Sequence, residues 1–443
     1  MRKSLFLLLA LPLFAQDSLS LRDAVQLALR ENQAIVASNA GLRAAETRID
    51  EARAGKLPKL NYSESYVRSD NPVFVFSSLL TQHQFGPEDF NIGPLNRPDS
   101  MNNFQSQLTV DQPLYDAGMT RSALKSADLS RQMSGEEQRR TQMQVIAGVV
   151  RAYYGEVLAA ESLKTAEQAV KSAQADLTQA ESVQAAGMST DVDVLSIRVH
   201  LAAVTEERIQ RTADLDVAKS ALNDAVGLPL DTAHTLSTAL APMALPSLTL
   251  ASLEKDASTT RPEVRQANLA ADLAKTQADS AHSMLLPQVG FHAAFEADRQ
   301  QFINKGGANW LASIGLHWNL FNGGSDKARI EESSHFLESA HANEQRTDSA
   351  VRLEVRRAWA DLGAAQQRIE VAQAAVAEAK ESLRITQNRY QAGMSNVTDL
   401  LRNETAVLAS QTRYLAAVHD QRIAATMLDL AAGRLSPNSE VLN

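Results

Sequence analysis

The chain of 443 residues contains no cysteine, only 5% aromatic residues and no long apolar run after its first residues. Without cysteine, neither a disulfide framework nor a lipid-modified cysteine is possible. A membrane-spanning helix needs about 18 consecutive apolar residues, so none is predicted beyond the N-terminal segment. If the chain enters a membrane, it must do so as strands closed into a barrel.

Basic charge is also scarce, since the formal net charge is −9. Nucleic acid requires basic patches, so it is not an expected partner. The sequence has no glycine-rich phosphate loop, no nucleophile elbow and no His-Glu-x-x-His, and its nine histidines are scattered. We therefore predict that the protein is not an enzyme and has no catalytic residues, no cofactor and no metal site.

The first fifteen residues are typical of a signal peptide. Arg2 and Lys3 precede an apolar run over residues 5–14, and the small residue Ala15 suits cleavage before Gln16. This segment is too short to span a bilayer as a helix. The mature chain is predicted to be exported.

The remainder of the chain contains an internal repeat of two copies. Ala-Gly-Met-Ser at 186–189 is followed by Asp193, and the same four residues at 392–395 are followed by Asp399, an offset of 393 − 187 = 206. Leu-Pro at 57–58 and 286–287 gives an offset of 229, so copy one carries 229 − 206 = 23 extra residues. A repeat of this length indicates one structural unit that has been duplicated and fused. The predicted division is a signal peptide (1–15), repeat one (16–230), a linker (231–249), repeat two (250–435) and a tail (436–443).

Each copy contains a long predicted helical hairpin. Residues 119–186 and 325–392 contain no proline, and apolar residues recur in them every seven positions, as Leu163, Val170 and Leu177 do. A helix of about 68 residues is roughly 100 Å long. Gly187 and Gly393 end these helices, and a second helix of about 40 residues is predicted to return from each.

Shorter segments alternate between apolar and polar residues, which predicts strands near 61–68, 104–114, 289–297 and 310–320. The first two are separated by a predicted loop of about thirty residues, where the extra 23 residues fall. We predict that Trp310, Trp318, Phe291 and Phe104 form an aromatic belt against outer membrane lipid. The alternative is that the tryptophans fill an ordinary core.

Four strands cannot close a membrane barrel, because the smallest known barrels need about eight. Three copies would supply twelve strands to one shared barrel, and the long helices would extend from it into the periplasm. The predicted fold class is therefore mainly α with a β-barrel part, built from a duplicated helix–strand–strand–long helix–helix unit. The predicted assembly is a homotrimer with a helical tunnel.

These features resemble the TolC-like outer membrane efflux proteins. The resemblance is carried by the repeated unit, the Leu-Pro before the first strand, the Ala-Gly-Met-Ser…Asp hairpin end and the opening Leu21-Arg22-Asp23-Ala24-Val25. It implies a passive exit duct in the outer membrane of a Gram-negative-type bacterium. It also implies two kinds of partner, a periplasmic adaptor and an inner-membrane RND or ABC transporter. The exported substrate is not implied.

The resemblance also implies a periplasmic gate. Asp399 matches one acidic position of the family's constriction, the second position is Arg402, and Tyr390 matches a tyrosine that helps to hold the entrance shut. The arginine of that closure corresponds to Ser395, and Asp193 is the repeat equivalent of Asp399, placed to pair across the hairpins with Arg402. An Asp early in a helix also stabilises its first turn, which is the alternative reading. The hairpin-end residues expected to contact the adaptor are Gly187, Met188, Ser189, Gly393, Met394 and Ser395.

Two other classes of protein remain possible from the residues alone. A secreted or periplasmic coiled-coil scaffold would need no pore and no aromatic belt. A self-sufficient porin would devote its length to many strands of about ten residues, whereas about four strand regions are predicted here.

Overall fold

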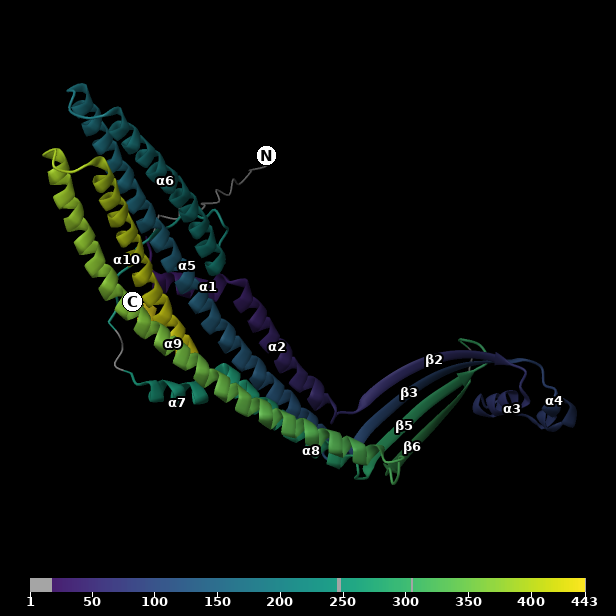
Figure 1. Ribbon diagram of the computed structural model, residues 1–443. Coiled ribbons are helices and arrows are strands. Elements are labelled where there is room, and N and C mark those ends of the chain that lie inside the picture. The colour runs from purple at the N-terminus through teal and green to yellow at the C-terminus, as the bar shows by residue number, and fades with distance from the viewer. Residues whose placement is uncertain (1–17, 245–247, 304–305, 443) are drawn as a thin grey trace, which may run out of the picture. The chain divides into compact units, whose positions relative to one another are not determined.

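A computed structural model describes residues 18–244, 248–303 and 306–442 (Figure 1). The predicted signal peptide, 1–15, lies outside the described residues. The described chain divides into two compact units. The first comprises residues 18–42, 134–267 and 344–442, and the second comprises 43–133 and 268–343. Each unit therefore takes residues from both sequence copies.

The elements repeat in order between the copies. The helices are α1 (Leu21–Glu31), α2 (Gln33–Ala54), α3 (Pro72–Thr81), α4 (Ile92–Asn96), α5 (Met119–Ala185), α6 (Asp191–Val226), α7 (Leu250–Thr260), α8 (Pro262–Ser283), α9 (Ser325–Gln391) and α10 (Val397–Ala431). The strands are β1 (Ser18–Leu19), β2 (Lys59–Ser69), β3 (Met101–Tyr115), β4 (Thr235–Leu236), β5 (Gln288–Arg299) and β6 (Gly307–His317). Two short 3₁₀ helices are η1 (Pro87–Phe90) and η2 (Glu440–Leu442).

The two predicted hairpins are confirmed. Helices α5 and α9 each contain 67 residues, and α6 and α10 return from them over 36 and 35 residues. The turns depend on Gly187 and Gly393, which have positive φ values of 77° and 70° that side chains with a Cβ rarely adopt. Small residues that alternate with this seven-residue repeat, Ala166, Ala173 and Ala180, are buried, which lets neighbouring helices approach closely. Among the described helices, none is both long and apolar enough to cross a membrane.

Four long strands form one antiparallel sheet in the second unit, in the order β2-β3-β5-β6. The pairing of β3 with β5 joins the two copies, and β2 and β6 are the two edges. Side chains alternate between the two faces. One face carries the row Tyr62, Leu108, Phe295 and Trp310, directly opposite one another across the four strands.

The predicted thirty-residue loop between β2 and β3 is wrong, because this segment contains α3, η1 and α4. Asn71 precedes α3 and its side-chain oxygen accepts hydrogen bonds from the backbone N–H groups of Val73 and Phe74, at 2.9 and 3.2 Å. Pro72 occupies the first helical position, where its missing N–H costs nothing. The N-cap Asn71 and Pro72 thus start a helix in a segment whose proline content had predicted a loop.

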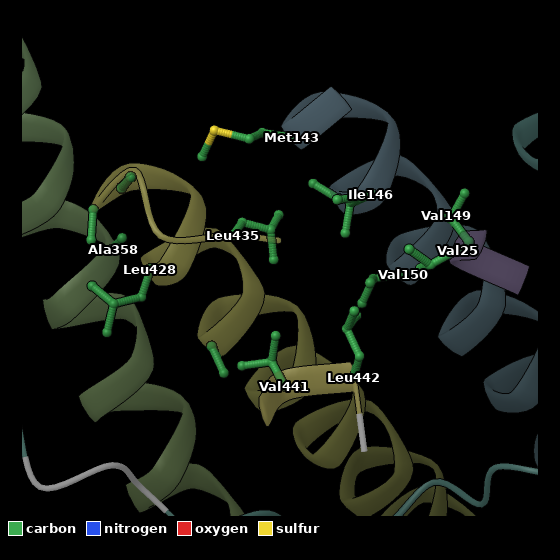
Figure 2. Packing of buried hydrophobic residues seen from close by; sticks show 14 of the residues in the cluster. Val25, Met143, Ile146, Val149, Val150, Ala358, Leu428, Leu435, Val441 and Leu442 are labelled. Carbon is green, nitrogen blue, oxygen red and sulfur yellow. The ribbon is translucent and has the colours of Figure 1, made fainter. Parts of the chain in front are cut away.

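The largest core lies in the first unit, where α1, α5, α9, α10 and η2 contribute to one buried apolar cluster (Figure 2). Val441 and Leu442, from the segment predicted to be a tail, are buried in it beside residues of α5. The fully buried Tyr153 donates a hydrogen bond to the backbone oxygen of Leu19 at 2.8 Å and accepts one from the Thr238 N–H at 2.9 Å. These bonds hold the short parallel pair β1–β4, which the sequence did not predict, against α5.

Candidate functional site

The four predicted gate residues lie near the hairpin ends, all within the first unit. Tyr390 is in the last turn of α9, Asp193 is in the first turn of α6, and Asp399 and Arg402 are at the start of α10. A small apolar cluster joins the two hairpins there, formed by Leu177, Ala180, Val194, Ile197 and Val397, with Leu201, Tyr390 and Leu401 packed against it. Tyr390 is therefore part of the contact between the hairpins.

The side chain of Asp193 makes its hydrogen bonds at the start of its own helix, α6. Its carboxylate accepts hydrogen bonds from the hydroxyl of Thr190 at 2.8 Å and the hydroxyl of Ser189 at 3.2 Å, while Thr190 accepts from the Asp193 N–H. The pair forms a capping box, which satisfies free N–H groups at the start of α6. The Thr190 hydroxyl bond holds the pKa of Asp193 below its ordinary value.

Asp399 is held differently. Its backbone N–H donates to the side-chain oxygen of Asn396 at 2.8 Å, and its carboxylate accepts from Arg402 at 3.4 Å. Arg402, expected to pair with Asp193 across the hairpins, pairs in this structure with Asp399, one turn away on the same helix. Proximity explains the difference, because residues three apart on a helix lie side by side.

Tyr390, on the copy-two hairpin, lies close to two acidic residues of the copy-one hairpin, Asp193 and Asp176. Burial raises the pKa of its phenol, and the charge of Asp193, with that of Asp176 once it ionises, raises this pKa further. The phenol therefore keeps its proton and is available as a hydrogen-bond donor at neutral pH.

A buried polar cluster that the sequence analysis missed connects three helices of the hairpins. Glu404 of α10 accepts a hydrogen bond from the Ser172 hydroxyl of α5 at 3.2 Å, and its other oxygen lies 3.2 Å from the His200 ring of α6. The carboxyl group of Asp176, four residues after Ser172, lies close enough to Glu404 for each carboxyl group to shift the pKa of the other. No sequence motif signals the cluster, because its members come from three distant segments.

Burial, the hydrogen bond with Glu404 and the charge of Glu404 together raise the pKa of Asp176 to about 8. Burial acts in the same upward direction on Glu404, but the hydrogen bonds from His200 and Asp176 outweigh it and lower the pKa of Glu404. At neutral pH the two carboxyl groups therefore hold one proton and one negative charge between them.

The residues predicted to contact an adaptor lie in the two connecting turns. Met188 and Met394 are 74% and 65% exposed, which places a flexible apolar side chain at the end of each hairpin. Gly187 and Gly393 make the turns, and Ser189 is engaged by Asp193. Ser395 is half-buried. The turns thus present apolar surface that the single chain does not cover.

Three of the residues predicted to form an aromatic belt share one face of the sheet, and Trp318 follows directly after the end of β6. Trp310 and Phe104 lie toward the end of the sheet where residues 70–100 connect β2 to β3, and Phe291 lies toward the opposite end. In the single chain Trp310 and Trp318 are 79% and 53% exposed, so they do not fill a core of this chain. The Trp318 indole N–H donates to the backbone oxygen of Leu285 at 3.0 Å, which fixes the ring beside the start of β5.

The same face carries a charged pair near the end of the sheet where residues 70–100 connect β2 to β3, where Arg299 lies 2.9 Å from Glu64. The opposite face is mostly polar, with residues such as Gln107, Thr109 and His292 along the strands. Among the residues that the structure describes, no group of three or more His, Asp or Glu side chains is arranged to hold a metal ion.

Comparison with known proteins gives a consistent result. The family model for outer membrane efflux proteins matches residues 24–228 and 253–434. The chain is 24% identical over 423 residues to the protein CyaE of Bordetella pertussis, covering 95% of this chain and 85% of CyaE. It is also 24% identical over 398 residues to the alkaline protease secretion protein AprF of Pseudomonas aeruginosa, covering 86% and 78% of the two chains.

Solved channel structures share the fold. The CmeC outer membrane channel of Campylobacter jejuni matches with a TM-score of 0.79 at 16% identity, over 95% of this chain and 87% of CmeC. The outer membrane protein VceC of Vibrio cholerae matches with a TM-score of 0.75 at 19% identity, over 93% and 96% of the two chains. The family model covers most of both copies, so the chain belongs to the outer membrane efflux protein family.

Proposed function

We propose that the exit duct provided by this outer membrane protein is a homotrimer, in which three four-stranded sheets close one twelve-stranded barrel. Its helical hairpins would extend the duct on the periplasmic side, and their ends would be closed until an adaptor and an inner-membrane RND or ABC transporter engage them. The relatives named above are outer membrane or secretion proteins, which does not favour the alternative of a coiled-coil scaffold without a pore. The chain's own residues do not distinguish the two transporter classes.

The observation that carries this proposal is the sheet with its two open edges. Strands β2 and β6, of 11 residues each, present unpaired backbone groups at the edges, and Trp310 and Tyr62 expose 79% and 67% of their surface on one face. An exposed long edge strand normally pairs with another strand. Lipid would cover the exposed aromatic side chains of the apolar face, and a neighbouring subunit at each edge would pair with the free backbone groups of β2 and β6.

The junction between the copies inside one chain suggests the register between subunits. Strand β3 pairs with β5, and in this pairing Gln107 lies opposite Glu296. The two sequence offsets carry Gln107 to Ser313 (107 + 206) and Glu296 to Val67 (296 − 229). If β6 pairs with β2 of the next subunit as β3 pairs with β5, Ser313 will lie opposite Val67 of that subunit.

The natural absence of cysteine makes this register testable by cross-linking. In a Val67→Cys, Ser313→Cys variant, oxidation should link each subunit to the next and give a covalent trimer on a non-reducing denaturing gel. Directly opposite residues have Cα atoms roughly 4.5–5.5 Å apart, within reach of a disulfide. The matched control is Ser63→Cys with Ser313→Cys, because Ser63 lies on the same face but four residues, about 13 Å, along the strand. Recovery of the wild-type protein as a soluble periplasmic monomer would contradict the proposal.

The gate is proposed at the hairpin ends. Tyr390 joins the two hairpins through the apolar cluster, and Asp399 with Arg402 lies beside it on α10. Separation of the hairpins would have to expose this cluster, which favours the closed arrangement in the absence of partners. The exposed Met188 and Met394 are the proposed adaptor contacts, because burial of flexible apolar side chains by a partner would offset that cost.

A further inference from the structure

The 31 residues between β2 and β3 in copy one, 70–100, form a folded element with α3, η1 and α4 and with ring contacts of its own. The rings of Phe76 and Phe85 meet edge to face with centroids 5.0 Å apart, and Phe85 meets Phe90 in the same way at 5.0 Å. The segment begins with the N-cap Asn71. In copy two the corresponding strands are joined by only seven residues, 300–306. This element, residues 70–100, is called the cap below.

Polar side chains anchor the cap to the sheet. The Gln82 amide N–H₂ group, just after α3, donates to the side-chain oxygen of Asn103 at 2.9 Å and to the backbone oxygen of Asn102 at 3.1 Å. Asn103 in turn donates to Asp298 of β5 at 2.6 Å. Gln82, Asn103 and Asp298 are 2%, 8% and 0% exposed. Burial strengthens these hydrogen bonds and makes their loss costly.

A second anchor brings the cap against β6. The side-chain N–H₂ group of Asn309 donates to the backbone oxygen of Thr81 at 3.2 Å, and the ring of His83 lies 3.4 Å from the Asn309 side-chain oxygen. Gly307 is buried under the same turn, where an added Cβ would lie 2.0 Å from the Thr81 oxygen. Only glycine permits this approach of the two backbones.

All of these anchoring residues of the sheet lie on one face. Asp298 of β5 lies directly opposite Gln105 of β3 and Gly307 of β6. Asn103 is two residues from Gln105, and Asn309 is two residues from Gly307, so both side chains share the face of Asp298. Trp310, three residues from Gly307, is on the other face. If the Trp310 face meets lipid, as the proposed function requires, the cap lies on the lumen side of the barrel.

We propose that the cap is a built-in closure of the outer mouth of the channel, with three caps meeting on the barrel axis. This inference rests on the trimeric barrel of the proposed function. Val73, Phe90 and Ile92 are 77%, 69% and 78% exposed in the single chain. A threefold barrel brings the lumen faces of its subunits toward one another, so the partners that cover these apolar side chains are the caps of the other two subunits. Export then requires the caps to separate as well as the periplasmic ends.

Accessibility to a bulky reagent tests this closure in intact cells. Thr109→Cys places a thiol on the lumen face of β3, on the periplasmic side of the cap, in a chain that has no other cysteine. A membrane-impermeant maleimide carried on a polyethylene glycol is added outside the cells. Asp70→Cys, exposed at the start of the cap, reports on surface access in parallel strains.

Two variants remove the closure. Gly307→Val drives a side chain into the Thr81 backbone, whereas its control, Gly315→Val on the same face of β6, has no atom within 4 Å of the added Cβ. The second variant replaces residues 70–100 with the seven-residue connection of copy two. Because a minor open state is typically populated to about 10% or less, labelling of Thr109→Cys should become about tenfold faster in both variants. It should be unchanged with Gly315→Val.

Equal labelling rates of Thr109→Cys in the wild-type, Gly307→Val and loop-replacement backgrounds would overturn the cap while leaving the trimeric channel intact. Loss of Asp70→Cys labelling from the cell surface, or a monomer on the gel, would instead overturn the proposed function and the cap with it. Faster labelling in the loop replacement alone supports the cap if Gly307→Val fails to assemble.

Discussion

The two hairpin ends are built from the same sequence pattern and use it differently. In copy one, Asp193 closes a capping box with Thr190. In copy two, Asn396 caps the helix alone, and the carboxylate of Asp399 pairs with Arg402. The first hairpin therefore satisfies its polar groups within its own turn. The second pairs Asp399 with Arg402 at the start of α10 and packs Tyr390 against the apolar cluster between the hairpins. The proposed gate uses this second hairpin end.

The largest expected effect is on conductance, and it tests whether the copy-two end is the gate. Tyr390→Ala combined with Asp399→Ala should raise single-channel conductance in planar bilayers severalfold, because it removes the Tyr390 contact between the hairpins and the Asp399 carboxylate proposed at the constriction. The copy-one control is Gln184→Ala, the repeat equivalent of Tyr390 (390 − 206), which lies outside the apolar cluster. Unchanged conductance in the double variant would remove these residues from the gate.

The two copies also differ around the glycines at the C-terminal ends of their returning helices, Gly227 after α6 and Gly433 after α10. Gly227 and Gly433 have φ values of 93° and 71°. A Cβ on Gly227 would lie 2.8 Å from the Glu31 backbone carbonyl, whereas the nearest atom at Gly433 is the Thr260 hydroxyl oxygen at 2.7 Å. A side chain can rotate away more easily than a backbone can move. Gly227→Ala should therefore lower the free energy of unfolding by about 2–4 kcal/mol, and Gly433→Ala by about 1–3 kcal/mol.

Thermal unfolding of the purified protein, followed by circular dichroism, measures both changes. Gly363→Ala in α9 serves as the control, since nothing lies within 4 Å of its added Cβ. This substitution should be neutral or stabilising by up to about 1 kcal/mol. A larger loss at Gly433 than at Gly227 would contradict the distinction between the copies.

The buried cluster predicts a pH dependence of stability. The folded-state pKa of Asp176, about 8, lies above its ordinary value of 3.8, so the folded protein holds the extra proton between these values. Its contribution to stability is fully present below pH of about 4 and is lost as the pH rises through about 8. Deprotonation then places two negative charges together beside His200 and near Tyr390.

Asp176→Asn should therefore flatten the decline of the unfolding temperature between about pH 4 and about pH 8, because the amide cannot ionise. Glu404→Gln, in contrast, weakens the bonds with His200 and Ser172 and should lower the unfolding temperature across this range. An Asp176→Asn protein that keeps the wild-type pH slope would show that the shared proton does not contribute.

The smallest expected effect concerns the charge at the gate. Arg402→Ala leaves the three Asp399 carboxylates of a trimer without their positive partners, so multivalent cations added on the periplasmic side should block the channel at lower concentration. The pair is exposed, so the free energy of unfolding should change by less than about 1 kcal/mol. Equal block of the wild type and the variant would indicate that Asp399 does not face the pore.

The sequence predicted the elements whose patterns are local. The helix limits at 119–186 and 325–392 differ from the observed ones by one residue, because glycine ends each helix. The strands were found through alternation. Helix α3 was missed because the prolines spread over residues 70–100 suggested a loop, although Asn71 followed by Pro72 is a recognisable helix start.

The site was harder to predict. The positions of Tyr390 and Asp399 were predicted from the family resemblance and from their spacing to Gly393. The ion-pair partner of Arg402 was expected on the other hairpin, whereas it is Asp399 on the same helix. The cluster of Asp176, His200 and Glu404 depends on how three helices rotate against one another. That rotation is set by packing over the whole hairpin, and short-range patterns do not encode it.

One further consequence follows from the core in which Leu21 near one end of the described chain and Leu442 near the other belong to the same apolar cluster. Contacts between residues so far apart in sequence form slowly, because a long loop must be closed first. The hairpins can form while the chain is still emerging, whereas this core waits for its last residues. Pulsed hydrogen exchange during refolding should accordingly show the amides of α6 protected before those of α1.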